Sequence, residues 1–146
     1  TVNVTIFNEG DFTENVTVTA YANTTAIGTQ TILNLAPNAS TTITLTWNTT
    51  GFAYGNYTLW AYATPVPSEV DTTDNTYTDG WVVVTIPGDF SGDFQVSPYD
   101  FALLALAYGS TPEAPKWNPN CDVDNNNKIG PFDFAILSIH YGEHYP

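Results

Sequence analysis

Apolar and polar residues alternate one for one along several short stretches at the start of this chain. The clearest stretches cover residues 2–6, 16–20, 43–47, 57–61 and 82–86. A period of two is typical of strands with one buried face, and turn-forming residues such as Pro37-Asn38 separate the stretches. Threonine, whose β-branched side chain suits a strand, occupies many outward positions. The pattern predicts a mainly β fold, with an antiparallel β-sandwich over residues 1–86.

The pattern changes at Pro87-Gly88, where Asp-rich loops begin to alternate with short apolar stretches. Residues 101–108 and 134–141 are apolar on nearly every side, and we expect two helices there that pack on each other and on the sandwich. The join between the two regions is too short for a flexible linker. Residues 87–146 are therefore predicted to form a second, small α-helical region.

Residues 89–109 and 122–142 align at an offset of 33 residues without a gap, and this internal repeat is the strongest signal in the sequence. Matches of this kind indicate a duplicated structural unit. The identical pairs are Asp89/Asp122, Pro98/Pro131, Asp100/Asp133, Phe101/Phe134, Ala102/Ala135, Leu104/Leu137, Tyr108/Tyr141 and Gly109/Gly142.

Each copy carries oxygen-bearing groups at the positions of a twelve-residue loop from which Ca²⁺ collects about six to eight oxygen ligands. Turns in which Asp and Asn cap the helices are the alternative, but they do not explain two loops in register. The predicted ligands of the first loop are Asp89, Ser91, Asp93, Gln95 through its carbonyl, Ser97 and Asp100. Those of the second are Asp122, Asp124, Asn126, Lys128 through its carbonyl and Asp133, with Gly130 at position 9.

Two other loop positions carry structural information. Position 6, where calcium loops usually have glycine, is Phe94 in the first loop and Asn127 in the second. Asn tolerates the left-handed conformation that this position needs, whereas Phe adopts it at a cost, so we expect the first site to be the weaker one. Position 8 is apolar in both copies, as Val96 and Ile129, and predicts a short β-type contact between the two loops.

The repeats GDFSGDFQVSPYDFALLALAYG and CDVDNNNKIGPFDFAILSIHYG resemble the two halves of dockerin modules, and the resemblance covers roughly residues 87–142. It implies a compact domain with two calcium loops and single exiting helices that docks onto cohesin partners. It also implies ligand roles for Asp89, Ser91, Asp93, Asp100, Asp122, Asp124, Asn126 and Asp133. Dockerins of cellulosomes recognise their partner through small polar residues at positions 10 and 11 of the calcium loop. This chain has Pro98-Tyr99 and Pro131-Phe132 there, so the resemblance carries calcium binding rather than cohesin recognition.

The stretches VTIFNEGDFTENVTVTAYAN, LAPNASTTITLTW, GNYTLWAYA and EVDTTDN resemble the CARDB family, which consists of immunoglobulin-like, adhesion-related sandwiches of secreted prokaryotic proteins. The resemblance covers residues 1–86. Such domains carry another strand ahead of the one at Val2 to Ile6, where this chain begins. Either that strand was cut from the piece at hand, or another copy or a neighbouring β-domain supplies it. In the second case we expect an open groove that accepts the donated strand, which would join subunits head to tail into a filament.

Charge and glycosylation signals limit the partners that the protein can bind and the compartment in which it works. The chain has 15 acidic residues against 2 lysines and no arginine, a formal net charge of -13, which argues against nucleic-acid binding and against docking on anionic membranes. The absence of methionine and the start at Thr1 suggest a processed or truncated piece. Six Asn-x-Ser/Thr triplets predict N-linked glycans and a secreted, cell-surface location. Their acceptors are Asn3, Asn15, Asn23, Asn38, Asn48 and Asn56.

The remaining candidates have structural alternatives. Trp60 and Tyr62 are expected on the outer face of the sandwich, as a sugar-stacking platform or subunit contact, unless the calcium module or glycans cover them. His140 and His144 are interpreted as helix-end residues rather than metal ligands. Cys121 is expected to be a buried thiol.

The chain lacks the residues of a catalytic site, which needs a nucleophile with a base, an acid–base pair or an open metal site. Both histidines lie within the last seven residues, and the clustered carboxylates are assigned to calcium. We therefore predict a non-enzymatic protein. Its expected function is a structural or adhesive extracellular glycoprotein, possible partners being further copies or a cohesin-like or surface-layer protein. The alternatives are a docking module of a larger secreted hydrolase and a carbohydrate-binding module.

Overall fold

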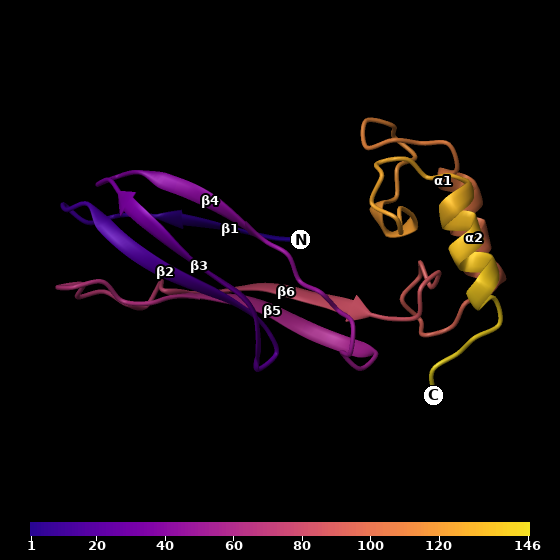
Figure 1. The fold of residues 1–146 in the computed structure, drawn as a ribbon, viewed down its shortest axis with the longest axis horizontal. Coiled ribbons are helices and arrows are strands. Elements are labelled where there is room, and N and C mark those ends of the chain that lie inside the picture. Colours follow the sequence, from indigo (N-terminus) through magenta and orange to yellow (C-terminus); the bar gives the residue numbers. More distant parts are fainter. The chain divides into compact units, whose positions relative to one another are not determined.

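The computed structural model describes all residues from 1 to 146 and divides into two compact units. The first unit comprises residues 1–52 and 56–82, and the second comprises residues 53–55 and 83–146. Strands build the first unit and short helices the second (Figure 1).

Six antiparallel strands form the sandwich. They are β1 (Val2–Phe7), β2 (Glu14–Ala22), β3 (Thr25–Leu35), β4 (Ser40–Leu45), β5 (Gly55–Ala63) and β6 (Thr76–Val84). Strands β1 and β4 form one sheet, and the other sheet has the order β3-β2-β5-β6. The mainly β, antiparallel architecture that the alternation predicted is confirmed.

Two strands differ from the prediction. Strand β3 was missed because most of its residues are exposed on an edge of the larger sheet, so its sequence lacks a regular apolar alternation. The last strand was predicted over residues 82–86 but runs from Thr76 to Val84. Its first half is polar and exposed, which hides it from a pattern based on apolar residues.

The core of the sandwich consists of small and medium apolar side chains from both sheets. The buried members are Val16, Val18, Ala20, Ile43, Leu45 and Ala61. The inward side chains of β1, namely Val2, Val4 and Ile6, pack against this core but are only half-buried. On the outer faces, threonine hydroxyls pair across strands, as Thr17 and Thr31 do at 2.9 Å, and such cross-strand pairs each contribute a fraction of a kcal/mol.

The second unit contains α1 (Pro98–Ala107), the short 3₁₀ helix η1 (Pro119–Cys121) and α2 (Pro131–His140). The helices were predicted from residues 101 and 134 but begin earlier, at the prolines at loop position 10. Proline favours the first helical position because its fixed φ is helical and its missing N–H is not needed there. None of the helices has the length and apolar character that a membrane span requires.

The two repeats exchange backbone hydrogen bonds in a reciprocal way. Val96 of the first loop pairs with the segment after α2, donating to the carbonyl of Glu143 at 2.9 Å. Ile129 of the second loop pairs with the segment after α1, donating to the carbonyl of Ser110 at 3.1 Å. The predicted β-type contact between the two loops is therefore wrong: each position-8 residue pairs with the chain that leaves the helix of the other repeat.

The core of the second unit gathers around these two residues. Its buried members are Ile86, Phe90, Val96, Leu104, Ala107, Cys121, Ile129 and Leu137. Gly88 lies directly against helix α2, and a Cβ added to it would come within 2.9 Å of the Leu137 Cα. Its φ of +95° also lies in the left-handed region that favours glycine.

Replacing Gly88 with alanine is expected to lower the free energy of unfolding by about 2–4 kcal/mol, since left-handed strain adds to overpacking against α2. Gly109→Ala is the matched control, because Gly109 has a φ of +77° but no neighbour within 4 Å. It should lose only about 1–2 kcal/mol. Urea unfolding of both variants measures the difference, and equal losses would contradict the close packing of Gly88.

Candidate calcium centres and an open groove

The first loop folds around the side chain of Asp89 at position 1. Its Oδ1 accepts hydrogen bonds from the N–H of Gly92 at 2.7 Å and from Ser91 Oγ at 3.0 Å. Its Oδ2 accepts the N–H of Phe94 at 2.8 Å and the hydroxyl of Thr85 at 2.5 Å. This one carboxylate therefore fixes the loop from position 3 to position 6.

The second loop folds in the same way around Asp122. Its Oδ1 accepts the N–H of Asn126 at 3.2 Å, and its Oδ2 accepts the N–H of Asn127 at 3.0 Å. These donors are at positions 5 and 6, and the equivalent N–H groups of the first loop donate to Asp89. The sequence repeat is thus also a repeat of backbone geometry.

Both loops use left-handed residues at positions 4 and 6. Position 6 is Phe94, with φ +66°, in the first loop and Asn127, with φ +62°, in the second. This confirms the conformation predicted there, which Phe adopts at a cost of about 1–2 kcal/mol. Position 4 is Gly92, with φ +76°, and Asn125, with φ +56°. The glycine and the asparagine at position 4 are the sequence signal for this left-handed conformation. The prediction from the sequence did not use that signal.

The position-12 carboxylates close each loop onto its helix and are fully buried. Asp100 accepts the N–H of Ser91 and of Ser97, both at 2.9 Å. Asp133 accepts the N–H of Val123 at 2.8 Å and of Gly130 at 2.7 Å. Each of these aspartates therefore binds the start of its loop with one oxygen and the start of its helix with the other.

Carboxylate oxygens gather in each loop. Those of Asp89, Asp93 and Asp100 lie within 4.8 Å of one another, and so do those of Asp122, Asp124 and Asp133. The one close contact between a carboxylate and a basic side chain is that of Glu143 with His140, so neither cluster has a cationic side chain as partner. At an effective dielectric constant of about 20, two charges at this distance repel by about 3 kcal/mol. A divalent cation bound at each cluster would replace this repulsion between carboxylates with attraction to the ion.

Hydrogen bonding keeps the buried Asp100 ionised. Burial raises the pKa of its carboxyl group, but hydrogen bonds from Ser97 and Ser91 outweigh burial and hold the pKa below the usual 3.8. Asp100 therefore carries its charge at neutral pH, as a hard oxygen ligand must.

The remaining predicted ligands border the carboxylates. The hydroxyls of Ser91 and Ser97 donate to Asp89 and Asp100, and the amide of Asn126 donates to Asp124 at 2.7 Å. The position-7 residues, Gln95 and Lys128, are exposed and precede the buried position 8. Gly130 offers no side-chain oxygen. The first loop therefore has one more side-chain oxygen than the second.

The other single residues named in the sequence analysis have the following surroundings. His140 Nδ1 lies 3.0 Å from Glu143 Oε2, and His144 is exposed. Cys121 is fully buried, as predicted. Burial, together with the charges of Asp133 and Asp100, raises the pKa of its thiol to about 11.

The outer-face aromatics Trp60 and Tyr62 are half-buried rather than freely exposed. Trp60 stacks on Tyr21 of the neighbouring strand, with ring centroids 4.1 Å apart and planes 8° from parallel. Its indole N–H also donates to the carbonyl of Asn23 at 2.7 Å. A ring face that already carries Tyr21 cannot stack on a sugar, which weakens the carbohydrate-binding alternative. The sequence could not reveal this cover, because Tyr21 lies far from Trp60 along the chain.

All six predicted glycosylation acceptors are exposed. They are Asn3, Asn15, Asn23, Asn38, Asn48 and Asn56, and they lie in strands, turns and one irregular segment of the sandwich. Several use the side-chain oxygen for a local hydrogen bond, as Asn15 does with the N–H of Asn34.

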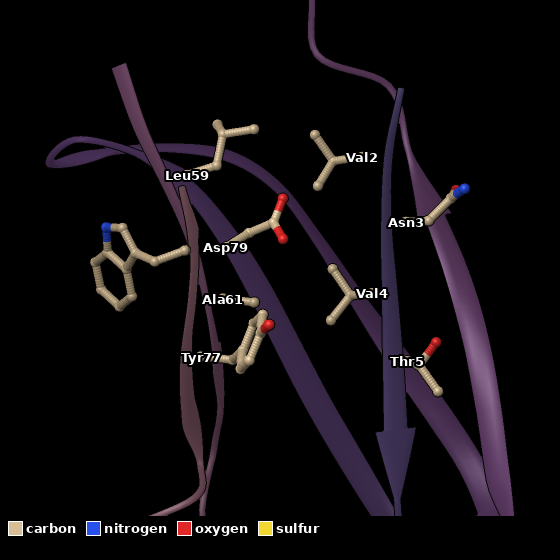
Figure 2. A pocket seen from close by; sticks show the side chains of 9 residues that line it. Val2, Asn3, Val4, Thr5, Leu59, Ala61, Tyr77 and Asp79 are labelled. Atoms are coloured by element: carbon tan, nitrogen blue, oxygen red, sulfur yellow. The ribbon is translucent and has the colours of Figure 1, made fainter. Parts of the chain in front are cut away.

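A groove opens between β1 and the pair β5 and β6 (Figure 2). It contains a cavity of about 340 Å³. Val2 and Val4 point into this space, whereas Asn3 and Thr5 point away from it toward β4. Tyr77 and Asp79 of β6 border the opposite side.

The CARDB family model matches residues 1–79, more than half of the chain. This chain therefore belongs to the CARDB family. CARDB is a non-enzymatic domain family, and membership indicates a surface or adhesion module in an extracellular setting.

Solved structures show weaker likenesses. A domain described as part of a cell surface protein from Methanosarcina acetivorans has 27% identity and a TM-score of 0.46, over 56% of this chain and 72% of that one. A chain of a type II cohesin–X-dockerin complex from Acetivibrio cellulolyticus has 16% identity and a TM-score of 0.37, over 99% and 97%. At these TM-scores neither likeness defines the fold. No curated protein matches the sequence.

Cys121 is expected to react with a maleimide at least about a hundredfold more slowly in the folded protein than in urea at pH 8. The reason is that burial blocks access and a pKa of about 11 leaves only about a thousandth of the thiol ionised. Stopped-flow labelling measures the rate, with free glutathione as the reference thiol. Equal rates in the folded and unfolded protein would contradict the burial of this side chain.

Proposed function

We propose that this chain is a non-catalytic structural or adhesion module of an extracellular surface protein, and that two Ca²⁺ ions hold its second unit in shape. The observation that carries the proposal is the gathering of three carboxylates within 4.8 Å in each of two duplicated loops, without a cationic partner. CARDB membership supports the surface and adhesion part. The resemblance of the duplicated loops to dockerin modules supports the calcium part.

Calcium fits the chemistry of these residues better than a softer metal. Every donor is an oxygen, and Ca²⁺ prefers carboxylate, hydroxyl, amide and carbonyl oxygens in a flexible cage. In the first loop Asp89, Asp93 and Asp100 would hold the ion, with help from neighbouring hydroxyls. The cluster of Asp122, Asp124 and Asp133 would hold the second. Two bound ions would bring the formal net charge from -13 to about -9.

The sandwich supplies the glycosylated part of the proposed module. Its six exposed acceptor asparagines support N-linked glycans on the first unit, which would shield its threonine-rich faces.

Extracellular calcium modules work with a Kd of about 10⁻⁴–10⁻³ M, which suits a secreted setting. The second unit, which holds the calcium loops, would be rigid outside the cell and would loosen wherever calcium is scarce. Subunits of this kind would join by donated strands into a surface filament.

A second candidate function, a docking module, is favoured by one observation. Equivalent positions of the two repeats expose large apolar side chains on and beside the helices. They form the pairs Tyr99 and Phe132, Phe101 and Phe134, Leu106 and Ile139, and Tyr108 and Tyr141. A duplicated apolar surface suits a protein partner, such as a cohesin-like or surface-layer protein.

Titration calorimetry of the whole chain is expected to show two Ca²⁺ ions bound per molecule. At ten times Kd each site would add about 1.4 kcal/mol to the free energy of unfolding, so thermal unfolding should shift upward by roughly 10 °C or more. Asp124→Asn and Asp93→Asn each remove one exposed carboxylate charge and should weaken their own site by about tenfold while affecting the other site less.

Glu113→Gln is the matched control, because it removes one exposed charge from the same unit outside both clusters. It should bind calcium like the wild-type chain. Absence of binding heat, together with an unchanged melting temperature in millimolar Ca²⁺, would overturn the calcium proposal.

Electron microscopy of purified protein, with and without a chelator, distinguishes the filament subunit from the docking module. Filaments with an axial repeat support the first, and their loss on chelation would link assembly to calcium. Dispersed particles support the docking module, for which the double variant Leu106→Ser and Ile139→Ser should abolish partner binding, since both side chains are about 70% exposed. An unchanged partner affinity in that variant would exclude the helix surface.

A further inference from the structure

The six acceptor asparagines differ in how tightly the fold holds the segment around each of them. A glycosyltransferase recognises the whole Asn-x-Ser/Thr triplet, the hydroxyl residue as well as the asparagine, and therefore has to surround all three residues. Exposure of the asparagine alone is not enough. The burial of the middle residue and the hydrogen bonds of the triplet decide whether the folded chain can present it.

Two of the triplets lie within strands, and in both the middle residue faces the core. In Asn3-Val4-Thr5 of β1, Figure 2 shows Val4 on one side of the strand and its two neighbours on the other. In β2, the middle residue of the triplet that starts at Asn15 is Val16, which is only 8% exposed. Either strand has to open locally before an enzyme can surround its triplet.

The polar groups of these two triplets are also hydrogen-bonded to neighbouring strands. Asn3 Oδ1 accepts the hydroxyl of Thr44 at 2.8 Å, and Asn15 Oδ1 accepts the N–H of Asn34 at 2.8 Å. The triplet hydroxyls pair across strands too, Thr5 with Thr42 and Thr17 with Thr31. Both recognition residues of each triplet are thus engaged while the sheets are intact.

Asn23 lies in the turn between β2 and β3, and all three residues of its triplet are exposed. Three hydrogen bonds nevertheless fix it to β5. Its N–H donates to the carbonyl of Thr58 and its Oδ1 accepts the N–H of Thr58, both at 2.9 Å. Its carbonyl accepts the indole N–H of Trp60 at 2.7 Å. Glycosylation of the folded chain at Asn23 would have to break these contacts.

The triplets of Asn38 and Asn56 each have a half-buried middle residue. These residues are Ala39 and Tyr57. The ring of Tyr57 packs against that of Trp47, with centroids 5.7 Å apart. An enzyme that surrounded either triplet would have to pull its middle residue out of its surroundings.

Asn48 has none of these restraints. It lies in the irregular segment between β4 and β5, and all three residues of its triplet, Asn48, Thr49 and Thr50, are exposed. Its Oδ1 accepts the N–H of Thr50 at 3.0 Å, which is an Asx turn within the triplet. The Thr49 carbonyl accepts the N–H of Phe52 at 3.0 Å, and the rings of Trp47 and Phe52 meet edge to face. The fold thus presents this triplet as a short exposed loop.

We propose that Asn48 is the acceptor that the folded protein presents for N-glycosylation, whereas Asn3 and Asn15 accept a glycan only before the sandwich folds. The donor is a lipid-linked sugar phosphate. The amide nitrogen of Asn48 forms a bond to C1 of the sugar, and a base of the transferase takes the amide proton. The bond from C1 to the phosphate oxygen breaks, and its electron pair leaves with the phosphate. The inference rests on the glycoprotein part of the proposed function and deepens it.

Glycosylation of the whole folded chain in vitro tests the proposal. The probe is a purified oligosaccharyltransferase with a short lipid-linked oligosaccharide as donor, and mass spectrometry reads the occupancy of each site over time. Asn48 should be modified at least about tenfold faster than Asn3 and Asn15, because their strands have to open first. Six synthetic peptides, each carrying one triplet, have no fold and should react at similar rates.

Matched variants assign the rates to the fold. Thr50→Val should abolish modification of Asn48 in the folded chain, and Thr50→Ser should preserve it, since serine also serves as the hydroxyl residue. Thr17→Val removes the same group from the triplet of Asn15 and should leave the rate of the folded chain unchanged. Ile43→Ala weakens the buried core. It should raise the rate at Asn15 and leave that at Asn48 unchanged.

Three results would overturn the inference. The first is modification of Asn15 as fast as Asn48 in the folded chain, and the second is a folded chain that stays unmodified while the peptides react. The third is the same preference for Asn48 among the peptides, which would assign it to local sequence. The mass of the native protein tests the proposed function separately. A native protein without any glycan would refute its glycoprotein part, whatever ranking the folded chain shows in vitro.

Discussion

Two buried aspartates, Asp100 and Asp133, hold the second unit together. Each places one oxygen on the beginning of its loop and the other on the beginning of its helix, and neither is exposed to water. A buried carboxylate is costly unless hydrogen bonds or a cation compensate it. Backbone N–H groups supply part of that compensation here, and the nearby carboxylates, at positions 1 and 5 of the first loop and positions 1 and 3 of the second, add repulsion. The calcium proposal follows from this balance, because a divalent ion is the partner that satisfies all three carboxylates at once.

The reciprocal pairing of the repeats couples the two centres. Val96 and Ile129 are fully buried, and each pairs with the segment that leaves the helix of the other repeat. Neither loop can open without disturbing the chain that follows the partner helix. An ion in one loop would therefore stiffen parts of both repeats, and a single filled site would retain much of the structure.

The sequence predicted the elements whose signal is local and missed those that depend on neighbours. The spacing of Asp89, Asp93 and Asp100 was enough to bring their carboxylates together, because a loop closed by its own turns needs no distant partner. The partner of Val96 was predicted wrongly, since apolar character says that a residue is buried but not against what. Strand β3 was missed for a related reason: its pairing with β2 is encoded by hydroxyl contacts such as Thr17 with Thr31 rather than by an apolar stripe.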